Sequence, residues 1–286
     1  MNQKLILGTV QFGLNYGINN LTGQPTEQEV FNIFDEAFLQ GIQFLDTADA
    51  YGNAINIIGN YHLRRNNTFK ILSKFNCIEK GKLGKNVKEA LEKLHISAFE
   101  VYSYHSFSSY SERPYLMEEL LLLKQQGMIK KIGISVYTND ELQYVINDDF
   151  IDVIQLPFNL LDNQNVRGNF MGQAKQKEKE IHIRSVYLQG LFFMDADNVP
   201  ERLISLKPYL QSLHDYCKKE SISMETLALS YALYNKNIDH VLIGVDTKEQ
   251  LIKNLHASKD IPQAFDYINQ KIQVKETELL NPVNWK

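Results

Sequence analysis

The chain has 286 residues and a mass of 33.1 kDa, which is long for one domain but within the range of undivided α/β barrels. Hydrophobic residues make up 44% of the chain and charged residues 22%, proportions that exclude a disordered or collagen-like chain. Lys plus Arg number 30 and Asp plus Glu number 34, so the formal net charge is −4. A nucleic-acid partner is not expected, because nucleic-acid binders usually carry a basic excess.

The cysteine content and the hydropathy pattern narrow the class further. Cys77 and Cys217 allow one disulfide but no disulfide framework, and neither lies in a CxxC motif or beside a histidine at zinc-ligand spacing. We therefore expect two reduced, partly buried thiols, no metal site and a cytoplasmic location. No apolar stretch approaches the length of a membrane span, and the apolar run at residues 5–7 is predicted to be a strand, not a signal peptide.

Eight short β-rich apolar runs alternate with segments of helical periodicity. Such alternation predicts βα units that build a parallel sheet. The predicted strands cover residues 4–8, 43–46, 69–74, 99–104, 132–135, 153–155, 182–185 and 240–244.

Three capping-box patterns mark the starts of helices. In a capping box, the side chain of the first residue accepts a hydrogen bond from the backbone of the last, and the side chain of the last residue accepts one from the backbone of the first. Two helical stretches are also predicted within residues 196–236, whereas the tail after about residue 258 shows only a weak helical pattern. The three patterns are Thr26 with Glu29, Thr138 with Glu141 and Thr247 with Gln250.

No Gly/Ser-rich or Pro-rich linker divides the chain. Eight βα units without a break favour an α/β fold of the (β/α)8 TIM-barrel type, with a single domain over residues 1–286. A doubly wound sheet is the alternative. It is less favoured because the dinucleotide fingerprint GxGxxG is missing after the first strand.

Polar residues stand where the second, third and fourth predicted strands end, and such strand ends carry the active sites of barrels. They are Asp46, Lys74 and His105, and Tyr51 follows on the loop after Asp46. A lysine ammonium beside a phenol favours the phenolate and lowers the phenol pKa from about 10. Asp46 would hold Lys74 charged, and a neutral His105 would orient a carbonyl group. The four residues therefore predict proton delivery to a carbonyl oxygen.

Several segments resemble the aldo-keto reductase family. Residues 44–52 are similar to its signature, as are residues 7–13 and 133–135, while residues 72–74 and 104–105 resemble its catalytic lysine and histidine sites. The resemblance runs from about residue 5 to about residue 255. It implies an NAD(P)(H)-dependent oxidoreductase that transfers hydride between a nicotinamide and a carbonyl or alcohol, with Tyr51 as the general acid/base.

The same resemblance implies a set of cofactor-binding residues. The family resemblance implies NADP(H), but many members carry Ser and Arg where this chain has Asp246 and Thr247. A 2′-phosphate would therefore meet a carboxylate here, so NAD(H) remains an alternative cofactor. Lys248 could offset the charge of that carboxylate. The implied residues are Ser135 and Gln155 for the nicotinamide carboxamide, with Asn159 nearby; Arg184 in place of the aromatic residue that stacks on the nicotinamide; Tyr187, Gln189 and Gly190 over the diphosphate; and Gly244, Asp246, Thr247, Lys248, Gln250 and Asn254 at the adenosine end.

The substrate side is less defined. The expected partner is a small-molecule carbonyl or alcohol, and Phe12, Tyr16 and Phe107 are candidates for the pocket wall. A short tail predicts an open pocket that accepts bulky or polar substrates such as sugar derivatives. The oligomeric state is not indicated.

Two other functions remain open. Lys74 could form a Schiff base in a lyase, although an ion pair with Asp46 would keep the lysine protonated. The chain could also be a nicotinamide-nucleotide-sensing regulatory subunit with little turnover, as some relatives of this fold are.

The remaining histidines have no motif context. His240 is expected at the bottom face of the barrel. The others are expected on the surface or at helix ends: His62, His95, His182, His214 and His256.

Overall fold

The computed structural model describes residues 2–18, 20, 23–76, 78–257 and 262–285. Eight parallel strands pair in chain order and the eighth pairs with the first, which closes the barrel and confirms the predicted (β/α)8 fold. The strands are β1 (Leu5–Gly8), β2 (Phe44–Asp46), β3 (Lys70–Phe75), β4 (Phe99–Tyr104), β5 (Ile129–Ser135), β6 (Val153–Pro157), β7 (Glu180–Arg184) and β8 (His240–Ile243).

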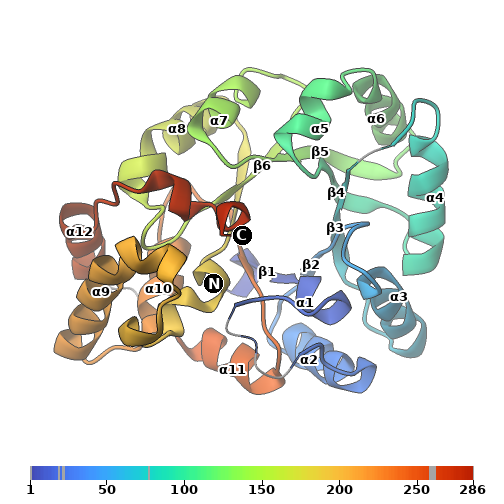
Figure 1. The fold of residues 1–286 in the computed structure, drawn as a ribbon. Coiled ribbons are helices and arrows are strands. Elements are labelled where there is room, and N and C mark those ends of the chain that lie inside the picture. The colour runs from blue at the N-terminus through green and yellow to red at the C-terminus, as the bar shows by residue number, and fades with distance from the viewer. Residues whose placement is uncertain (1, 19, 21–22, 77, 258–261, 286) are drawn as a thin grey trace.

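Helices surround the barrel on its outside (Figure 1). The predicted pair between β7 and β8 forms as α9 and α10, preceded by several 3₁₀ turns. The helices are α1 (Val10–Gly13), α2 (Glu27–Leu39), α3 (Ala54–Arg64), α4 (Leu83–Leu94), α5 (Phe107–Glu112), α6 (Leu116–Gln125), α7 (Asn139–Val145), α8 (Gln164–Gln176), α9 (Lys207–Glu220), α10 (Met224–Leu233), α11 (Lys248–Ala257) and α12 (Pro262–Lys271).

Two of the three capping boxes form as predicted, at the starts of α2 and α7. At α11, the Gln250 backbone N–H donates to the Thr247 hydroxyl at 3.2 Å, but the Gln250 side chain accepts from the backbone N–H of Asp246 instead of Thr247. The reciprocal bond is therefore displaced by one residue. This difference places Gln250 beside Asp246 at the carboxyl end of β8.

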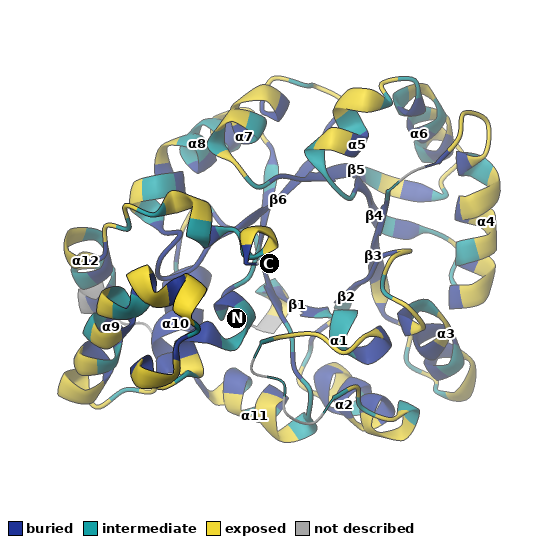
Figure 2. Ribbon diagram, viewed as in Figure 1, coloured by how far each residue is buried: buried dark blue, intermediate teal, exposed yellow. Residues whose placement is uncertain are grey.

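Side chains alternate along each strand between the barrel interior and the helices. The outward set joins the helices in one large apolar core, which is dark blue in Figure 2. Gly133 lies in the narrow interior, where a Cβ would collide with the Ser103 hydroxyl. The interior is a packed core rather than a channel, with polar groups gathered at its two ends. Its apolar layer at mid-height consists of Ile6, Leu72, Val101, Val153 and Leu242.

The tail is more structured than its weak helical pattern indicated. α12 buries Ala264 and Ile268, and the ring of Tyr267 stacks on Tyr216 with 4.1 Å between the ring centroids. The buried positions form a narrow stripe among polar residues, which explains the weak signal. After α12 the chain returns across the barrel end, as the red segment of Figure 1 shows, and buries Trp285.

The structure bears on the predicted state of the cysteines and on membrane-spanning helices. Cys217 is a buried free thiol, as expected, whereas Cys77 lies outside the described residues. Within the described part of the chain, none of the helices is both long enough and apolar enough to cross a membrane.

Candidate active site

A cavity of about 640 Å³ lies at the carboxyl ends of the barrel strands. This volume is within the range of pockets that hold small molecules and cofactors. Each strand places a residue at this cavity, either within the strand or directly after it: Gly8, Asp46, Lys74, His105, Ser135, Gln155, Arg184 and Gly244. The parallel register of neighbouring strands brings these positions to one level around the opening.

Asp46 and Lys74 form a buried ion pair at the base of the cavity. Their side chains are only 4% and 3% exposed. The other carboxylate oxygen of Asp46 accepts a hydrogen bond from Gln155 Nε2 at 3.0 Å. Burial alone would lower the pKa of Lys74, but the Asp46 carboxylate raises it above its usual value, so Lys74 is an ammonium at neutral pH.

Tyr51 stands beside this ion pair. Lys74 Nζ lies 5.4 Å from the centroid of the Tyr51 ring, and the phenol and the ammonium interact directly. The loop that carries Tyr51 packs against α1 so closely that a Cβ at Gly13 would collide with the backbone oxygen of Tyr51. Gly52, at φ +53°, makes the same contact from the other side. These two glycines allow the close approach that brings the phenol over the barrel.

The pKa of the Tyr51 phenol differs from the value expected from its neighbour. Burial raises this pKa, and the Asp46 carboxylate raises it further, while the Lys74 ammonium lowers it. The net direction is upward, because the loss of hydration outweighs the ammonium. The expectation of a lowered pKa is therefore wrong for the protein alone, and Tyr51 is a protonated phenol at neutral pH.

His105 follows β4 and faces the Tyr51 ring, with 5.8 Å between the ring centroids and an angle of 77° between the planes. Burial and then the Lys74 ammonium lower the pKa of His105 to about 4. The ring is therefore neutral at pH 7, as predicted. Its Nδ1 is buried and has no hydrogen-bond partner among the described residues.

Three of the residues expected to contact the nicotinamide, Ser135, Gln155 and Arg184, line the same cavity. The hydroxyl of Ser135 is buried without a partner among the described residues, so it has a free hydrogen-bonding capacity inside the cavity. The Arg184 guanidinium lies over the ring of Tyr137 at 4.1 Å from the centroid. Asn159 does not reach the cavity. Its side chain holds the β6–α8 loop through the backbone of Leu161, Asp162 and Ser185.

The loop after β7 carries the residues expected over the diphosphate. Tyr187, Gln189 and Gly190 all line the cavity. Ser185, Leu188 and Gln189 have positive φ angles of 62°, 46° and 54°, although none of them is glycine. Such strained backbone persists where the surrounding structure fixes it, and it occurs preferentially at ligand sites.

Four of the six residues expected at the adenosine end line the cavity. Gly244, Asp246, Gln250 and Asn254 line the cavity, and Tyr187 donates its hydroxyl proton to Asn254 Oδ1 at 2.9 Å.

Thr247 and Lys248 do not line the cavity. Thr247 directly precedes α11, and the Lys248 ammonium lies 2.8 Å from a carboxylate oxygen of Glu36 on α2. The expectation that Lys248 offsets the Asp246 carboxylate is therefore wrong in the structure, because Lys248 is paired elsewhere.

Two of the three predicted substrate residues lie elsewhere. Tyr16 lines the cavity, where its hydroxyl accepts a hydrogen bond from Gln189 at 3.3 Å. Phe12 is fully buried and packs against Phe34, so its assignment to the pocket is wrong: α1 turns this side chain into the core. Phe107 packs against Tyr110 and Tyr144 outside the cavity, so its assignment is wrong as well.

Several contributions to the cavity were missed by sequence reasoning. Gln11 lines it with a buried side-chain oxygen that lacks a partner among the described residues, and Gln11 belongs to the segment 7–13 that carried the resemblance. Lys253 and Glu225 enter it as an ion pair. The returning tail adds Asn281, Pro282 and Val283, so the tail walls a pocket that its short length was expected to leave open. Only the Gln11 segment carried a signal in the sequence.

Comparisons with known proteins agree with this geometry. The sequence model of the Aldo/keto reductase family matches residues 4–272. L-galactose dehydrogenase of Arabidopsis thaliana is 24% identical over 282 residues, covering 91% of this chain and 87% of the relative. NADH-specific methylglyoxal reductase of Escherichia coli is 23% identical over 265 residues, covering 78% and 80%. The holo form of the aldo-keto reductase AKR11C1 from Bacillus halodurans superposes with a TM-score of 0.72 at 21% identity, covering 96% of this chain and 94% of that one.

The barrel and these comparisons define an oxidoreductase that uses a nicotinamide cofactor to interconvert carbonyl and alcohol groups. The chain belongs to the aldo/keto reductase family.

Proposed function

We propose that Tyr51 is the general acid/base of this enzyme and that Lys74, Asp46 and His105 assist it. The observation that carries the proposal is the meeting of the phenol, the ammonium and a neutral imidazole at one cavity. In carbonyl reduction, the Tyr51 phenol gives its proton to the carbonyl oxygen as the alcohol forms. Lys74 then stabilises the phenolate that remains, and solvent returns the proton. A reduced nicotinamide, when bound in this cavity, would supply the hydride to the carbonyl carbon.

His105 positions the carbonyl group in this proposal. A buried N–H without an acceptor is rare, so the unpartnered Nδ1 is assigned as the bare nitrogen and Nε2 as the protonated one. A neutral Nε2–H donates a hydrogen bond without competing with Tyr51 for the role of acid, because a ring with a pKa of about 4 holds its second proton only in acid.

Residues of the cavity fit a nicotinamide nucleotide. Ser135 and Gln11 each offer a buried polar atom that has no partner in the described part of the chain, and a carboxamide would satisfy such atoms. Arg184 presents a planar guanidinium that can stack on an aromatic ring, as it already does on Tyr137. Asn254 and Gln250 would contact the adenosine end.

The raised pKa of Tyr51 predicts opposite pH profiles for the two directions of reaction. Reduction needs the phenol, so its kcat/KM should stay flat through neutral pH and fall only above about pH 10. Alcohol oxidation needs the phenolate, so its kcat/KM should rise about tenfold per pH unit between pH 7 and 9. Initial rates in both directions across this range check the prediction. A fall in kcat/KM for reduction that begins near pH 7 would contradict the prediction.

For the cofactor, we propose a preference for NAD(H) over NADP(H). The Asp246 carboxylate lines the cavity at the adenosine end, where a carboxylate suits a ribose 2′-hydroxyl and repels a 2′-phosphate. The two nearby lysines are neutralised, Lys248 by Glu36 and Lys253 by Glu225.

Asp246→Ser should therefore tighten NADPH binding by about tenfold and change NADH binding much less, because one repulsive charge pair is removed. Fluorescence titration of both nucleotides measures the two Kd values. Lys248→Ala is the matched control, and its NADPH affinity should match that of the wild type. Tighter binding of NADPH than of NADH by the wild-type protein would refute the assignment.

For the substrate, we propose a small polar carbonyl compound or sugar. Polar and charged side chains such as His105, Arg184 and Tyr16 line the cavity, and the relatives' names include L-galactose and methylglyoxal. Rates of NADH oxidation or NAD⁺ reduction with 4-nitrobenzaldehyde, methylglyoxal and aldose sugars test the class of substrate.

The paired, protonated state of Lys74 disfavours the Schiff-base alternative, since an amine must lose its proton to attack a carbonyl. Nucleotide binding without turnover across this panel would favour a sensing role.

A further inference from the structure

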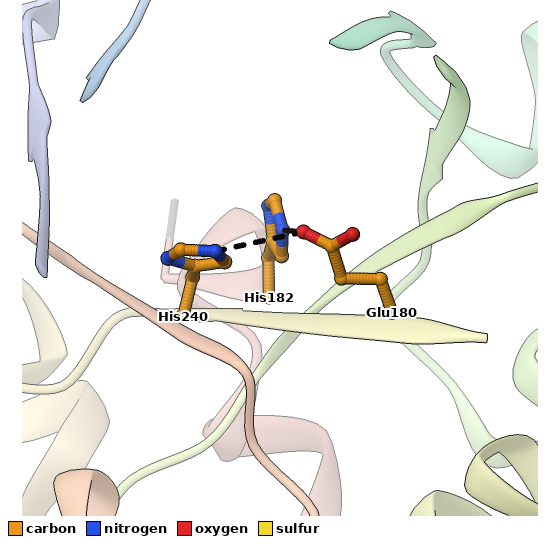
Figure 3. A group of neighbouring side chains, drawn as sticks. All are labelled: Glu180, His182 and His240. Carbon is orange, nitrogen blue, oxygen red and sulfur yellow. Dashed lines mark hydrogen bonds and ion pairs between the residues drawn. The ribbon is translucent and has the colours of Figure 1, made fainter. Parts of the chain in front are cut away.

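A second polar cluster lies at the opposite, amino-terminal end of the barrel. Figure 3 shows Glu180 and His182 on β7 and His240 on β8, with their side chains gathered on one side of the strands. His182 and His240 are register partners on neighbouring strands, and Glu180 shares the inward face of β7 with His182. His182 was expected on the surface, but it is only 2% exposed. That expectation is wrong because His182 belongs to the interior of the barrel.

We propose that Glu180, His182 and His240 bind a divalent transition-metal ion such as Zn²⁺ at the base of the barrel. Each residue offers one ligand atom, and the three atoms lie within 4.8 Å of one another. Two histidines and one carboxylate are a recurrent zinc-ligand set. The site is distinct from the cavity at the carboxyl end, so the ion would join β7 to β8 and take no part in hydride transfer.

The distances fit this coordination. Oε1 of Glu180 lies 2.7 Å from Nε2 of His182 and 3.6 Å from Nε2 of His240. Ligand atoms about 2.0–2.1 Å from a tetrahedral zinc ion are about 3.3 Å apart, so the first pair must open by roughly 0.6 Å and the second must close by roughly 0.3 Å to admit the ion. The fourth position would be taken by water, because the described residues offer three ligands.

The orientation of the His240 ring fits the role of a metal ligand. Its Nδ1 lies 3.3 Å from the backbone oxygen of Lys4, which can only accept, so Nδ1 carries the proton. In this tautomer Nε2 is the bare nitrogen of the ring, and it lies 3.6 Å from Oε1 of Glu180. A metal ion would satisfy both, and the Nδ1–H bond to a backbone carbonyl is the usual outer contact of a metal-binding histidine.

One neighbour weakens the site. Lys131 on β5 pairs with Oε2 of Glu180, the oxygen that does not face the histidines. Lys131 therefore orients the carboxylate, but its ammonium also repels a metal ion. In addition, Nδ1 of His182 has no acceptor among the described residues, so coordination through Nε2 leaves a lone N–H there. Affinity should accordingly be lower than that of closed structural zinc sites.

Tag-free full-length protein, freed of metal with a chelator, tests the proposal. Zn²⁺ at about 100-fold above its Kd should raise the Tm by roughly 5–10 °C, and Co²⁺ should give the visible absorption of a tetrahedral site. His240→Gln, at a half-buried position, should abolish both effects and retain reductase activity. Lys131→Met should bind the ion about tenfold more tightly, because the competing charge is gone.

Two results would overturn the proposed metal site. Absence of a Tm increase and of a Co²⁺ spectrum in the wild-type protein would overturn the site. An undiminished Co²⁺ spectrum in His240→Gln would place the ion elsewhere on the chain and overturn the assignment to these residues. Neither result would bear on the reductase cavity.

Discussion

Tyr51→Phe should reduce kcat for carbonyl reduction by about 10²–10⁴-fold, the range that general acid–base catalysis contributes. The substitution removes only the hydroxyl group, so the ring contact with His105 and the packing of the loop against α1 remain. The Kd for NADH should stay nearly unchanged. Steady-state kinetics with a reactive aldehyde and nucleotide titration by fluorescence measure the two quantities on the same preparation.

Tyr16→Phe is the matched comparison for this variant. Tyr16 is a second phenol in the same cavity, but it lies in the loop after α1, where its hydroxyl accepts a hydrogen bond from Gln189. Loss of the Tyr16 hydroxyl should reduce kcat several-fold at most. If Tyr16→Phe were the variant that lost turnover and Tyr51→Phe remained active, the acid would have to be reassigned to Tyr16.

Lys74→Met should lower both turnover and stability. It leaves the Asp46 carboxylate buried without a cation, which costs about 3–5 kcal/mol of unfolding free energy. In a chain of this size that cost corresponds to a fall in Tm of roughly 10 °C. Turnover should fall by at least about 10²-fold, because the Tyr51 phenolate loses its stabilising charge. Thermal unfolding and kinetics check the two effects separately.

The double variant Asp46→Asn/Lys74→Met separates these effects. It removes both charges, so no unpaired ion stays buried and the Tm should recover most of its loss. Turnover should remain low, since the ammonium is still missing. A double variant that regained both stability and activity would show that Lys74 is needed only to neutralise Asp46.

The arrangement of the barrel could be predicted because its signals are local. Alternating strands and helices, with capping boxes such as Thr26 with Glu29, fix the order of elements, and parallel strands then align their carboxyl ends. The positions of Asp46, Lys74 and His105 at the cavity follow from that alignment alone.

Features that depend on distant contacts could not be predicted. Phe12 follows a strand end as the site residues do, but α1 turns its ring into the core. The partner of Lys248 is Glu36, which is remote in the sequence. The tail reaches the cavity only because α12 packs on α10 first. The direction of the Tyr51 pKa depends on how far burial outweighs one ammonium, a balance that residue types do not reveal.

The cluster at the base of the barrel escaped the sequence for a similar reason. Glu180 and His182 are close in the chain, but His240 joins them only through the pairing of β7 with β8. Zinc-ligand spacings in sequences describe ligands on one turn or helix, whereas this group is assembled across two strands.

Transfer of deuterium from NADH labelled at C4 of the nicotinamide tests the central claim most directly. Both labelled epimers are incubated with the enzyme and an accepted aldehyde, and the alcohol is analysed by mass spectrometry and NMR. We expect deuterium on the former carbonyl carbon from one epimer only, in wild-type protein and, at a greatly reduced rate, in Tyr51→Phe. An alcohol free of deuterium with both epimers, despite tight nucleotide binding, would contradict direct hydride transfer in this cavity.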